Sequence, residues 1–401
     1  MPLRETLTNS WDHIQSFLFP ILREEVGLLT AQHQRLVVVL DVARVEAFVQ
    51  MYPGLPGRPP EDRHALARAF VAKAVLDLAT TSGLIERLAV DATLRRLCGW
   101  ERASQVPSES TFSRAFAEFA ESSLPNRVHE ALIKRTYKDC IVGHISRDAT
   151  AIEAREKPVE KSNNDKDGPS PPPTSASSTV GAEPQRKRGR PRKGEERPKP
   201  EPTRLERQTT QNVPQMLADL PTACDVGAKK NSKGYKETWI GYKLHIDVAS
   251  GQIPVACVLT SASVHDSQVA IPLMTMTSAR VSYLYDLMDA AYDAVAIAAQ
   301  SVALGHVPLI DRNFRAQHEA KTECAEEVAR MKFIHLPDPD DVLYDFRTMV
   351  ERINGRLKDE FGGRFVRVRG AVKVKCHLMF GILALTVDQI FRVGPFTPAP
   401  A

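Results

Sequence analysis

Residues 239–263 read WIGYKLHIDVASGQIPVACVLTSAS. Branched and aromatic side chains fill two runs on either side of Ser250-Gly251-Gln252, and a small polar turn between such runs predicts an antiparallel β-hairpin. A third run, CIVGHISRDATAIEA at residues 140–154, begins apolar and ends in a polar cluster, which is typical of a further strand. Together these stretches predict the antiparallel half of a β-sheet.

Downstream of the hairpin, helix-like and strand-like segments alternate. They are DSQVAIPLMTM (266–276), VSYLYDLMDAA (281–291), VAIAAQSVAL (295–304), HVPLIDRN (306–313) and a long helix at about 342–360. Three strands followed by such alternation predict an α/β fold, with a mixed sheet flanked by helices. The order is that of a ribonuclease-H-like core, although other α/β folds share parts of it.

Residues 1–139 are expected to form an all-helical N-terminal domain. Apolar residues at helical spacing mark its faces, among them Leu66, Phe70 and Ala74, then Phe112 and Phe116. The size fits a helix-turn-helix-like DNA-binding domain. Periodicity alone favours a packing or dimerisation module equally.

Proline composition divides the rest of the chain. Of the 28 prolines, 12 lie between Pro158 and Pro221, in a segment with few aromatic or branched residues. Such a segment cannot bury enough apolar surface to fold. The sequence therefore predicts a first core strand at 140–156, a disordered insertion at 157–222, and the remainder of the core at 223–395.

A basic run, RKRGRPRK at residues 186–193, lies within the predicted insertion. Its Arg188-Gly189-Arg190-Pro191 resembles the core of an AT-hook. Extended arginines suit the narrow, electronegative minor groove of A·T tracts, and glycine allows close approach of the backbone. Arg188 and Arg190 are thus candidate DNA-binding residues. The alternative is a polybasic linker that binds phosphate without sequence preference.

Composition excludes several classes of protein. Apolar residues make up 43% and charged residues 25%, and the net charge is only +4. The six cysteines are scattered, without the paired spacing of a zinc site or a disulfide scaffold, which suits a reducing cytoplasm. No signal peptide is recognisable, and the apolar stretch at 378–385 is too short to span a bilayer. We therefore expect a cytoplasmic, nucleoid-associated protein without a membrane partner.

Three acidic residues are placed to converge. Asp148 ends the first strand, Asp289 follows the apolar strand at 283–288, and Glu351 lies in the last core helix. Convergent carboxylates favour Mg²⁺, with Mn²⁺ as a substitute, and two such ions can promote in-line phosphoryl displacement. Asp286 and Asp293 compete with Asp289 for the second position.

The helix YDFRTMVERINGRLK carries a polar stripe beside its apolar one. Tyr344, Arg347, Glu351 and Lys358 fall within about 60° around a helix, at 100° per residue. The apolar stripe can then bury against the sheet, and the polar one presents an acid between two cations. A solvated face with ion pairs at helical spacing is the alternative.

This spacing resembles the Tyr-Arg-Glu-Lys signature of one group of bacterial insertion-sequence DDE transposases. Asp148 in Arg-Asp-Ala-Thr and Asp289 in Asp-x-Ala-Tyr-Asp also resemble the settings of that family's first two acids, although it more often has Gly where this chain has Ala291. Residues 234–245 and 264–267 look like its second and third strands, and residues 63–122 are similar to its N-terminal helical domain.

The resemblance implies a DNA transposase that nicks the ends of its element and joins the freed 3′-hydroxyl to target DNA. Asp148, Asp289 and Glu351 would be the catalytic metal ligands, holding two Mg²⁺ ions, while Tyr344, Arg347 and Lys358 would bind phosphates. The partner would be double-stranded DNA, both element ends and target, bound by a homodimer. Two alternatives are a catalytically silent DNA-binding protein derived from a transposase, and a plain metal-dependent nuclease.

Overall fold

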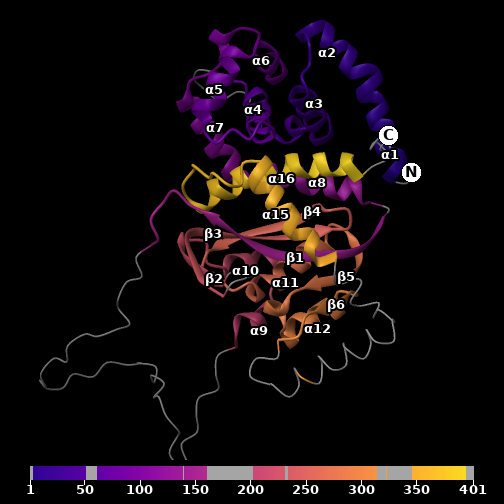
Figure 1. Cartoon of the computed structure of the whole chain (residues 1–401), viewed down its shortest axis with the longest axis vertical. Coiled ribbons are helices and arrows are strands. Elements are labelled where there is room, and N and C mark those ends of the chain that lie inside the picture. Colours follow the sequence, from indigo (N-terminus) through magenta and orange to yellow (C-terminus); the bar gives the residue numbers. More distant parts are fainter. Residues whose placement is uncertain are drawn as a thin grey trace, which may run out of the picture.

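The computed structural model describes residues 3–50, 61–138, 140–159, 202–230, 234–313, 322 and 346–393. The N-terminal helices lie at one end of the molecule, and a β-sheet with its covering helices lies at the other (Figure 1). Helices α8 (Leu124–Thr136) and α16 (Ala371–Val393) lie between the two parts.

The sheet has six strands among the described residues: β1 (Ile141–Glu153), β2 (Asp225–Lys230), β3 (Lys236–Ala249), β4 (Ile253–Ser261), β5 (Ser282–Met288) and β6 (Val307–Ile310). The order across it is β4-β3-β1-β5-β6, with β2 paired to the outer part of β3. Strands β3 and β4 are antiparallel to their neighbours, whereas β5 and β6 run parallel to β1. This topology confirms the predicted α/β class with a ribonuclease-H-like mixed sheet.

The predicted hairpin forms β3 and β4. The chain reverses through Gly251 and Gln252, whose φ angles of +85° and +62° lie in the left-handed region. All nine residues of β4 are buried, because α16 covers one face of the strand and α11 (Ser267–Ser278) covers the other.

Each face of the sheet has its own set of helices. On one face lie α11, α12 (Val295–Ala303) and two short helices, α9 (Arg204–Gln208) and α10 (Val213–Ala218). On the other lie α16, α15 (Met349–Glu360) and the 3₁₀ turn η5 (Phe346–Thr348). The carboxyl end of β5 lies beside the middle of β1, between these two sets of helices.

The insertion predicted at 157–222 includes residues that are folded in the structure. Residues 203–220, expected to be disordered, form α9 and α10 and pack on α11. Met216 is buried against Ile271 and Met274, and the Gln208 side chain donates a hydrogen bond from Nε2 to the Gln268 carbonyl at 2.8 Å. These helices form because tertiary contacts outweigh the proline content of the segment. Residues 160–201, with the predicted hook, lie outside the described part of the chain.

Two local predictions also differ from the structure. Residues 264–267 were expected in a strand, but residues 264–266 form the turn after β4 and Ser267 begins α11, with Asp266 as its N-cap. The last core helix was expected from about residue 342, but the α-helix begins at Met349 and Arg347 lies in η5. Tyr344 lies outside the described residues.

The N-terminal part is all-helical over its described residues. It contains α1 (Leu3–His13), η1 (Ile14–Leu18), α2 (Phe19–Val26), α3 (Ala31–Ala43), η2 (Val45–Phe48), α4 (Arg63–Val75), α5 (Thr81–Val90), α6 (Ala92–Cys98), η3 (Ala103–Gln105), α7 (Glu109–Glu121) and α8. The predicted apolar faces meet at Phe70, whose ring lies 5.0 Å from that of Phe116 in α7 and 5.9 Å from that of Phe380 in α16.

Helix α16 joins this region to the sheet. It packs on α3, α4, α7 and α8 as well as on β4, so a single apolar core runs through both parts. By length and composition α16 could cross a membrane, but 78% of its most apolar window is buried inside the protein, as expected for a core helix. At Gly381 a Cβ atom would lie 2.4 Å from the Phe361 carbonyl oxygen, so only glycine permits this approach to the end of α15.

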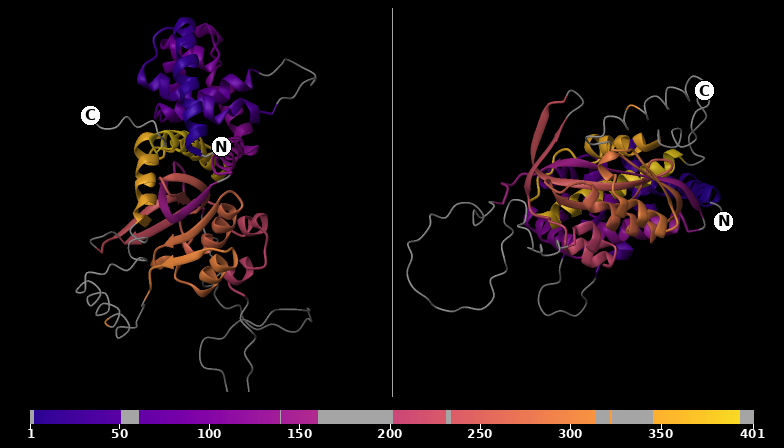
Figure 2. Two further views of the ribbon diagram at one scale, coloured as in Figure 1. Left: turned by 90° about the vertical axis from the view of Figure 1, so that its right-hand side faces the viewer. Right: turned by 90° about the horizontal axis from the view of Figure 1, so that it is seen from below.

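Strand β2 was not predicted. It pairs with the first half of β3 to form a two-stranded ribbon that projects beyond the sheet (Figure 2). Gly227 accommodates the Trp239 ring, since a Cβ atom there would lie 2.3 Å from it. The segment is short and largely exposed, so it lacks the alternation that would identify a half-buried strand.

Candidate active site

Asp148 and Asp289 lie side by side on two neighbouring parallel strands. Asp289 directly follows β5, as expected, but Asp148 lies within β1, which does not end there and continues to Glu153 because it stays paired with β3. The β1–β5 register pairs Ser146 with Leu287, which brings Asp148 next to Asp289 two residues further on. Asp289 is the N-cap of the 3₁₀ turn η4 (Ala290–Tyr292), and its Oδ1 accepts a hydrogen bond from the Ala291 amide at 3.0 Å. Because Tyr292 is buried under this turn, the turn fixes the direction of the Asp289 carboxylate.

Burial and like charges destabilise the ionised form of both carboxylates. Burial, then the charges of Asp289 and Asp266, raise the pKa of Asp148 to about 7, although the Ala149 amide and Arg347 act in the opposite direction. The pKa of Asp289 is also raised, by burial and by the charges of Asp266 and Asp311. The site therefore concentrates negative charge with one guanidinium group nearby.

This donor set fits a divalent magnesium ion. Mg²⁺ is usually held by one or two carboxylates together with water and substrate phosphates, rather than by a complete protein cage. Asp148 and Asp289 supply such a pair of hard oxygen ligands. Within the described ranges, no group of three or more acidic, histidine or cysteine side chains forms a metal cage.

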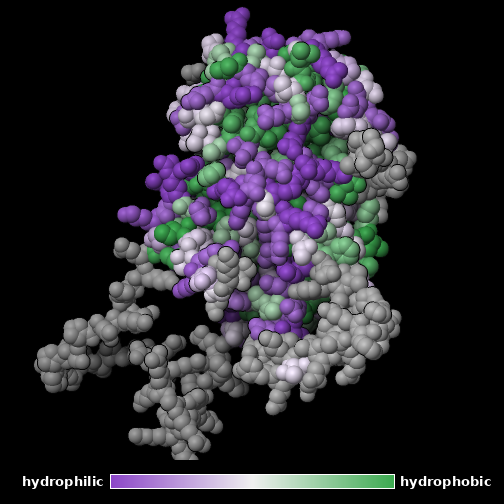
Figure 3. Space-filling model, viewed as in Figure 1, coloured by the Kyte–Doolittle hydropathy of each residue, from purple (hydrophilic) through white to green (hydrophobic). Residues whose placement is uncertain are grey.

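Glu351, the third predicted acid, lies at the edge of this site. It occupies the first turn of α15, its side chain is 56% exposed, and it pairs with Arg347 at 3.5 Å (Nη1 to Oε1). Figure 3 shows hydrophilic residues gathered over α15 and α16 on this face. The structure therefore brings Asp148 and Asp289 together and leaves Glu351 directed toward solvent.

The two predicted phosphate-binding cations lie at opposite ends of α15. Arg347, in η5, is half-buried and acts electrostatically on both Asp148 and Asp289. Lys358 is in the last turn, where burial and then the positive charges of Lys229 and Arg364 lower its pKa. Lys358 thus belongs to a basic cluster with Arg364 and with Lys229 of the β2–β3 ribbon.

Asp286 lies on the face of the sheet opposite to Asp148 and is part of a buried ion-pair network. Arg147 donates to both oxygens of Asp247, at 2.8 and 2.7 Å, and to Asp286 Oδ1 at 3.3 Å. The Ser301 hydroxyl in α12 donates to Asp286 Oδ2 at 2.6 Å, and the Thr277 hydroxyl in α11 donates to Asp247 Oδ2 at 2.6 Å. The network attaches α11 and α12 to the sheet, so Asp247 and Asp286 have structural roles.

Asp293, the other competitor, accepts a hydrogen bond from the Asn313 amide at 2.9 Å, through its Oδ2 atom. This contact joins the turn after η4 to the segment that follows β6. The preference for Asp289 as the second acid therefore rests on its position beside Asp148.

We expect Asp286→Ala and Asp289→Asn to separate stability from catalysis. Removing one partner of a buried ion pair costs about 3–5 kcal/mol, so the Asp286 variant should unfold at a much lower urea concentration. Asp289→Asn should be at least as stable as the wild type at neutral pH, because burial raises the pKa of Asp289 and the neutral amide avoids that cost, and it should lose DNA nicking. Urea unfolding and a plasmid-nicking assay check this, and a stable Asp286 variant that has lost only nicking would reverse the assignment.

Sequence reasoning missed two residues of this site. Asp266 acts electrostatically on both Asp148 and Asp289 and forms an ion pair with Lys243 at 2.9 Å. Asn354, one turn after Glu351, donates a hydrogen bond to Asp148 Oδ2 at 3.4 Å. Asp266 belongs to the Val-His-Asp-Ser stretch at 264–267, which was a usable signal, whereas Asn354 was not among the residues considered from the sequence.

Two histidines near strand ends, His245 and His265, contact neighbouring hydroxyl groups. His245 is buried, its Nε2 lies 3.0 Å from Thr260 Oγ1, and burial lowers its pKa to about 4. His265 contacts Ser267, with Nδ1 2.8 Å from Oγ.

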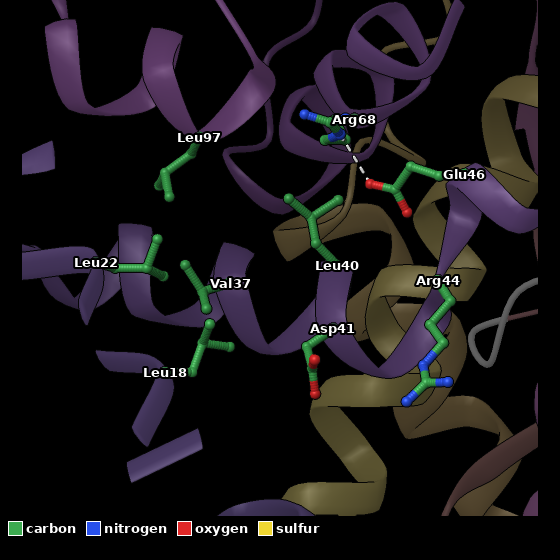
Figure 4. A pocket seen from close by; sticks show the side chains of 9 residues that line it. All are labelled: Leu18, Leu22, Val37, Leu40, Asp41, Arg44, Glu46, Arg68 and Leu97. Atoms are coloured by element: carbon green, nitrogen blue, oxygen red, sulfur yellow. Dashed lines mark ion pairs between the residues drawn. The ribbon is translucent and has the colours of Figure 1, made fainter. Parts of the chain in front are cut away.

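A pocket of about 350 Å³ lies among the N-terminal helices, away from the acids (Figure 4). Aliphatic side chains (Leu18, Leu22, Val37, Leu40 and Leu97) line one part of it and charged side chains line the rest, with an ion pair of 2.8 Å that joins Arg68 Nε to Glu46. Its two carboxylates, Asp41 and Glu46, share the lining with two arginines, Arg44 and Arg68, so the pocket lacks the excess of negative charge around Asp148 and Asp289.

Comparison with known proteins gives two matches. A family described as "Transposase DDE domain" matches residues 203–387, and one described as "Transposase domain (DUF772)" matches residues 29–118. The first match starts at α9, within the segment expected to be disordered, and includes Asp289 and Glu351 but not Asp148. No curated protein and no solved structure matches the chain.

Proposed function

We propose, because the chain belongs to the insertion-sequence DDE transposases, that it nicks the ends of its element and joins them to target DNA. Members of this family cleave DNA and transfer strands. The observation that carries this proposal is the Asp148–Asp289 pair, where neighbouring charges and burial raise both pKa values. Carboxylates in such surroundings are poised to bind a cation.

Asp148, Asp289 and Glu351 are the proposed metal ligands, with two Mg²⁺ ions as the natural cofactor and Mn²⁺ as a substitute. When bound, the ions would activate the attacking water or 3′-hydroxyl and stabilise the leaving oxygen. Asp148 and Asp289 are already adjacent, whereas the exposed Glu351 side chain would have to rotate inward from Arg347. Catalytic contacts of this kind often tighten only when substrate is bound.

DNA phosphates are the proposed partners of Arg347 and Lys358, and of Tyr344 in the Tyr-Arg-Glu-Lys signature. Arg347 lies close to the acidic pair, and Lys358 lies in the basic cluster with Lys229 and Arg364. Placed at the two ends of α15, they would hold a duplex along the helix, with the scissile phosphate near Asp148.

Arg347→Ala and Lys358→Ala should each weaken binding to the element's end. Each lost phosphate contact should lower the slope of log K against log salt concentration by about 0.9. Fluorescence anisotropy over a salt series measures both quantities. Lys138→Ala, an exposed cation outside α15, is the control, and unchanged slopes in both α15 variants would place the duplex elsewhere.

The N-terminal helices are proposed to bind the ends of the element as a helix-turn-helix-like domain. Their match to a transposase domain and the exposed side chains of Arg96, Arg102 and Arg114 support this role. The enzyme would act as a homodimer on double-stranded DNA in the cytoplasm.

The hook is proposed from Arg188-Gly189-Arg190-Pro191, which lies outside the described residues. Arg188→Ala together with Arg190→Ala should reduce affinity for A·T-rich duplex more than for G·C-rich duplex, because the narrow A·T minor groove attracts arginine. Competition binding with the two duplexes at one salt concentration tests this, and equal losses would leave a nonspecific phosphate-binding tether.

One reaction tests the proposed function against both alternatives. The protein is incubated with Mg²⁺, a pre-nicked element end and a target plasmid. Strand transfer is the expected product. Cutting without joining would indicate a plain nuclease, and binding without cutting would indicate a catalytically silent derivative.

A further inference from the structure

One polar side chain interrupts the buried face of α15. Val350, Ile353 and Leu357 form this face and are fully buried against the sheet, as the amphipathic pattern requires. Asn354 lies beside them with only 6% of its surface exposed. An amide here loses its hydration, so its hydrogen bonds must come from the protein or from what the protein binds.

The Asn354 amide is directed at the catalytic pair. Its Nδ2 donates to Asp148 Oδ2 at 3.4 Å. The carboxylate decides the orientation of the amide, because a flipped amide would place two acceptor oxygens against each other. The other end, Oδ1, is buried and has no hydrogen-bond partner among the described residues.

We propose that Asn354 is a positioning residue, which holds the Asp148 carboxylate in the orientation that faces Asp289 and thereby raises the affinity of the pair for a divalent cation. This inference rests on the proposed function. Carboxylate ligands are commonly fixed by such second hydrogen bonds, and loss of the bond typically weakens metal binding about 10- to 100-fold.

A purely structural role explains the residue less well. A long hydrogen bond on one side and an unpartnered oxygen on the other contribute little to folding, and the neighbouring positions are aliphatic. A leucine has the same four side-chain heavy atoms, branched at the same position, and would bury without an unsatisfied polar atom. Asn354→Leu should therefore fold at least as stably as the wild type.

The full-length protein without DNA allows a direct test. Isothermal titration with Mn²⁺ gives the cation affinity, the Mg²⁺ dependence of nicking gives a half-saturation concentration, and thermal unfolding gives Tm. Asn354→Leu should bind Mn²⁺ about 10- to 100-fold more weakly and raise the Mg²⁺ half-saturation by a similar factor, with Tm unchanged or higher. Asn354→Ser, which cannot reach Asp148, should show the same loss of affinity if the leucine variant fails to fold.

Gln389→Leu is the matched control. Gln389 is also a buried amide with 6% exposure, but it bonds to Arg356 and to the Gly251 carbonyl rather than to an acid of the site. This variant should lower Tm and leave Mn²⁺ affinity unchanged.

Two results would overturn the inference, and they can be told apart. Unchanged Mn²⁺ affinity in a folded Asn354 variant, together with a loss in Asp148→Asn, would reject the role of Asn354 alone. A wild-type protein that binds no Mn²⁺ would reject both this inference and the metal site on which it rests.

Discussion

Asp148→Asn and Asp289→Asn should each reduce DNA nicking by more than about 10²–10³-fold, the effect of losing one preorganised electrostatic group. Each substitution keeps the size of the side chain and removes the charge that would hold a divalent ion. Binding to the element's end should persist, because neither carboxylate contacts phosphate directly. Nicking of supercoiled plasmid, measured beside anisotropy binding, separates the two effects.

Glu351→Gln should have a comparable effect, although its side chain is exposed and paired with Arg347 in the structure. Asp359→Asn, at an exposed position of the same helix, is the matched control and should retain activity. Full nicking by Asp289→Asn, with loss in Asp293→Asn, would show that the second acid had been chosen wrongly.

The second large effect concerns stability and pH. The Asp148 pKa of about 7 lies above its ordinary value of 3.8, so the folded protein favours the protonated carboxyl group. The contribution of Asp148 to the free energy of unfolding is therefore most favourable below pH 3.8. It decreases as pH rises from 3.8 to about 7 and stays at its lower value above that pH. A shift of this size corresponds to about 4 kcal/mol. Asp148→Asn should thus unfold at a higher urea concentration than the wild type at pH 8, and the difference should shrink at pH 5.

Asp388→Asn serves as the control, because this substitution should change the stability of the protein in the opposite direction. Burial raises its pKa, but hydrogen bonding to Arg356 and the charges of Arg35, Arg392 and Arg356 hold it below the ordinary range. Removing that carboxylate should destabilise the protein at pH 8. Added Mg²⁺ should stabilise the wild type at pH 8 but not Asp148→Asn, and equal urea midpoints for those two proteins at pH 8 without metal would contradict the electrostatic account.

The strands and the two strand-end acids could be predicted because their signals are local. Alternating or continuous apolar runs identify β1, β3, β4 and β5, and the parallel register of β1 and β5 brings Asp148, where the apolar run of β1 gives way to polar residues, beside Asp289, which follows β5. The continuation of β1 to Glu153 was not expected, because it depends on pairing with β3. The ribonuclease-H-like order then follows from the sequence of elements, and the match to a transposase DDE domain agrees with it.

Features that depend on distant partners were harder to predict. Helices α9 and α10 are short and lie in a proline-rich stretch. Capping boxes at Thr203–Glu206 and Asn212–Gln215 are their local signals, and contacts such as Met216 against Met274 hold them on the fold. The role of α16 is similar, because its apolar surface does not reveal that it packs on both the N-terminal helices and β4. Asn354 is polar at a position that only the folded helix identifies as buried.

The position of a bound cation tests the central claim most directly. Crystals of the wild-type protein soaked in Mn²⁺ should give an anomalous difference peak between the carboxylates of Asp148 and Asp289. Crystals of Asp148→Asn treated in the same way should lack it. A strong peak elsewhere, with none between these two carboxylates, would contradict the proposal that this pair is the metal-binding centre of the transposase.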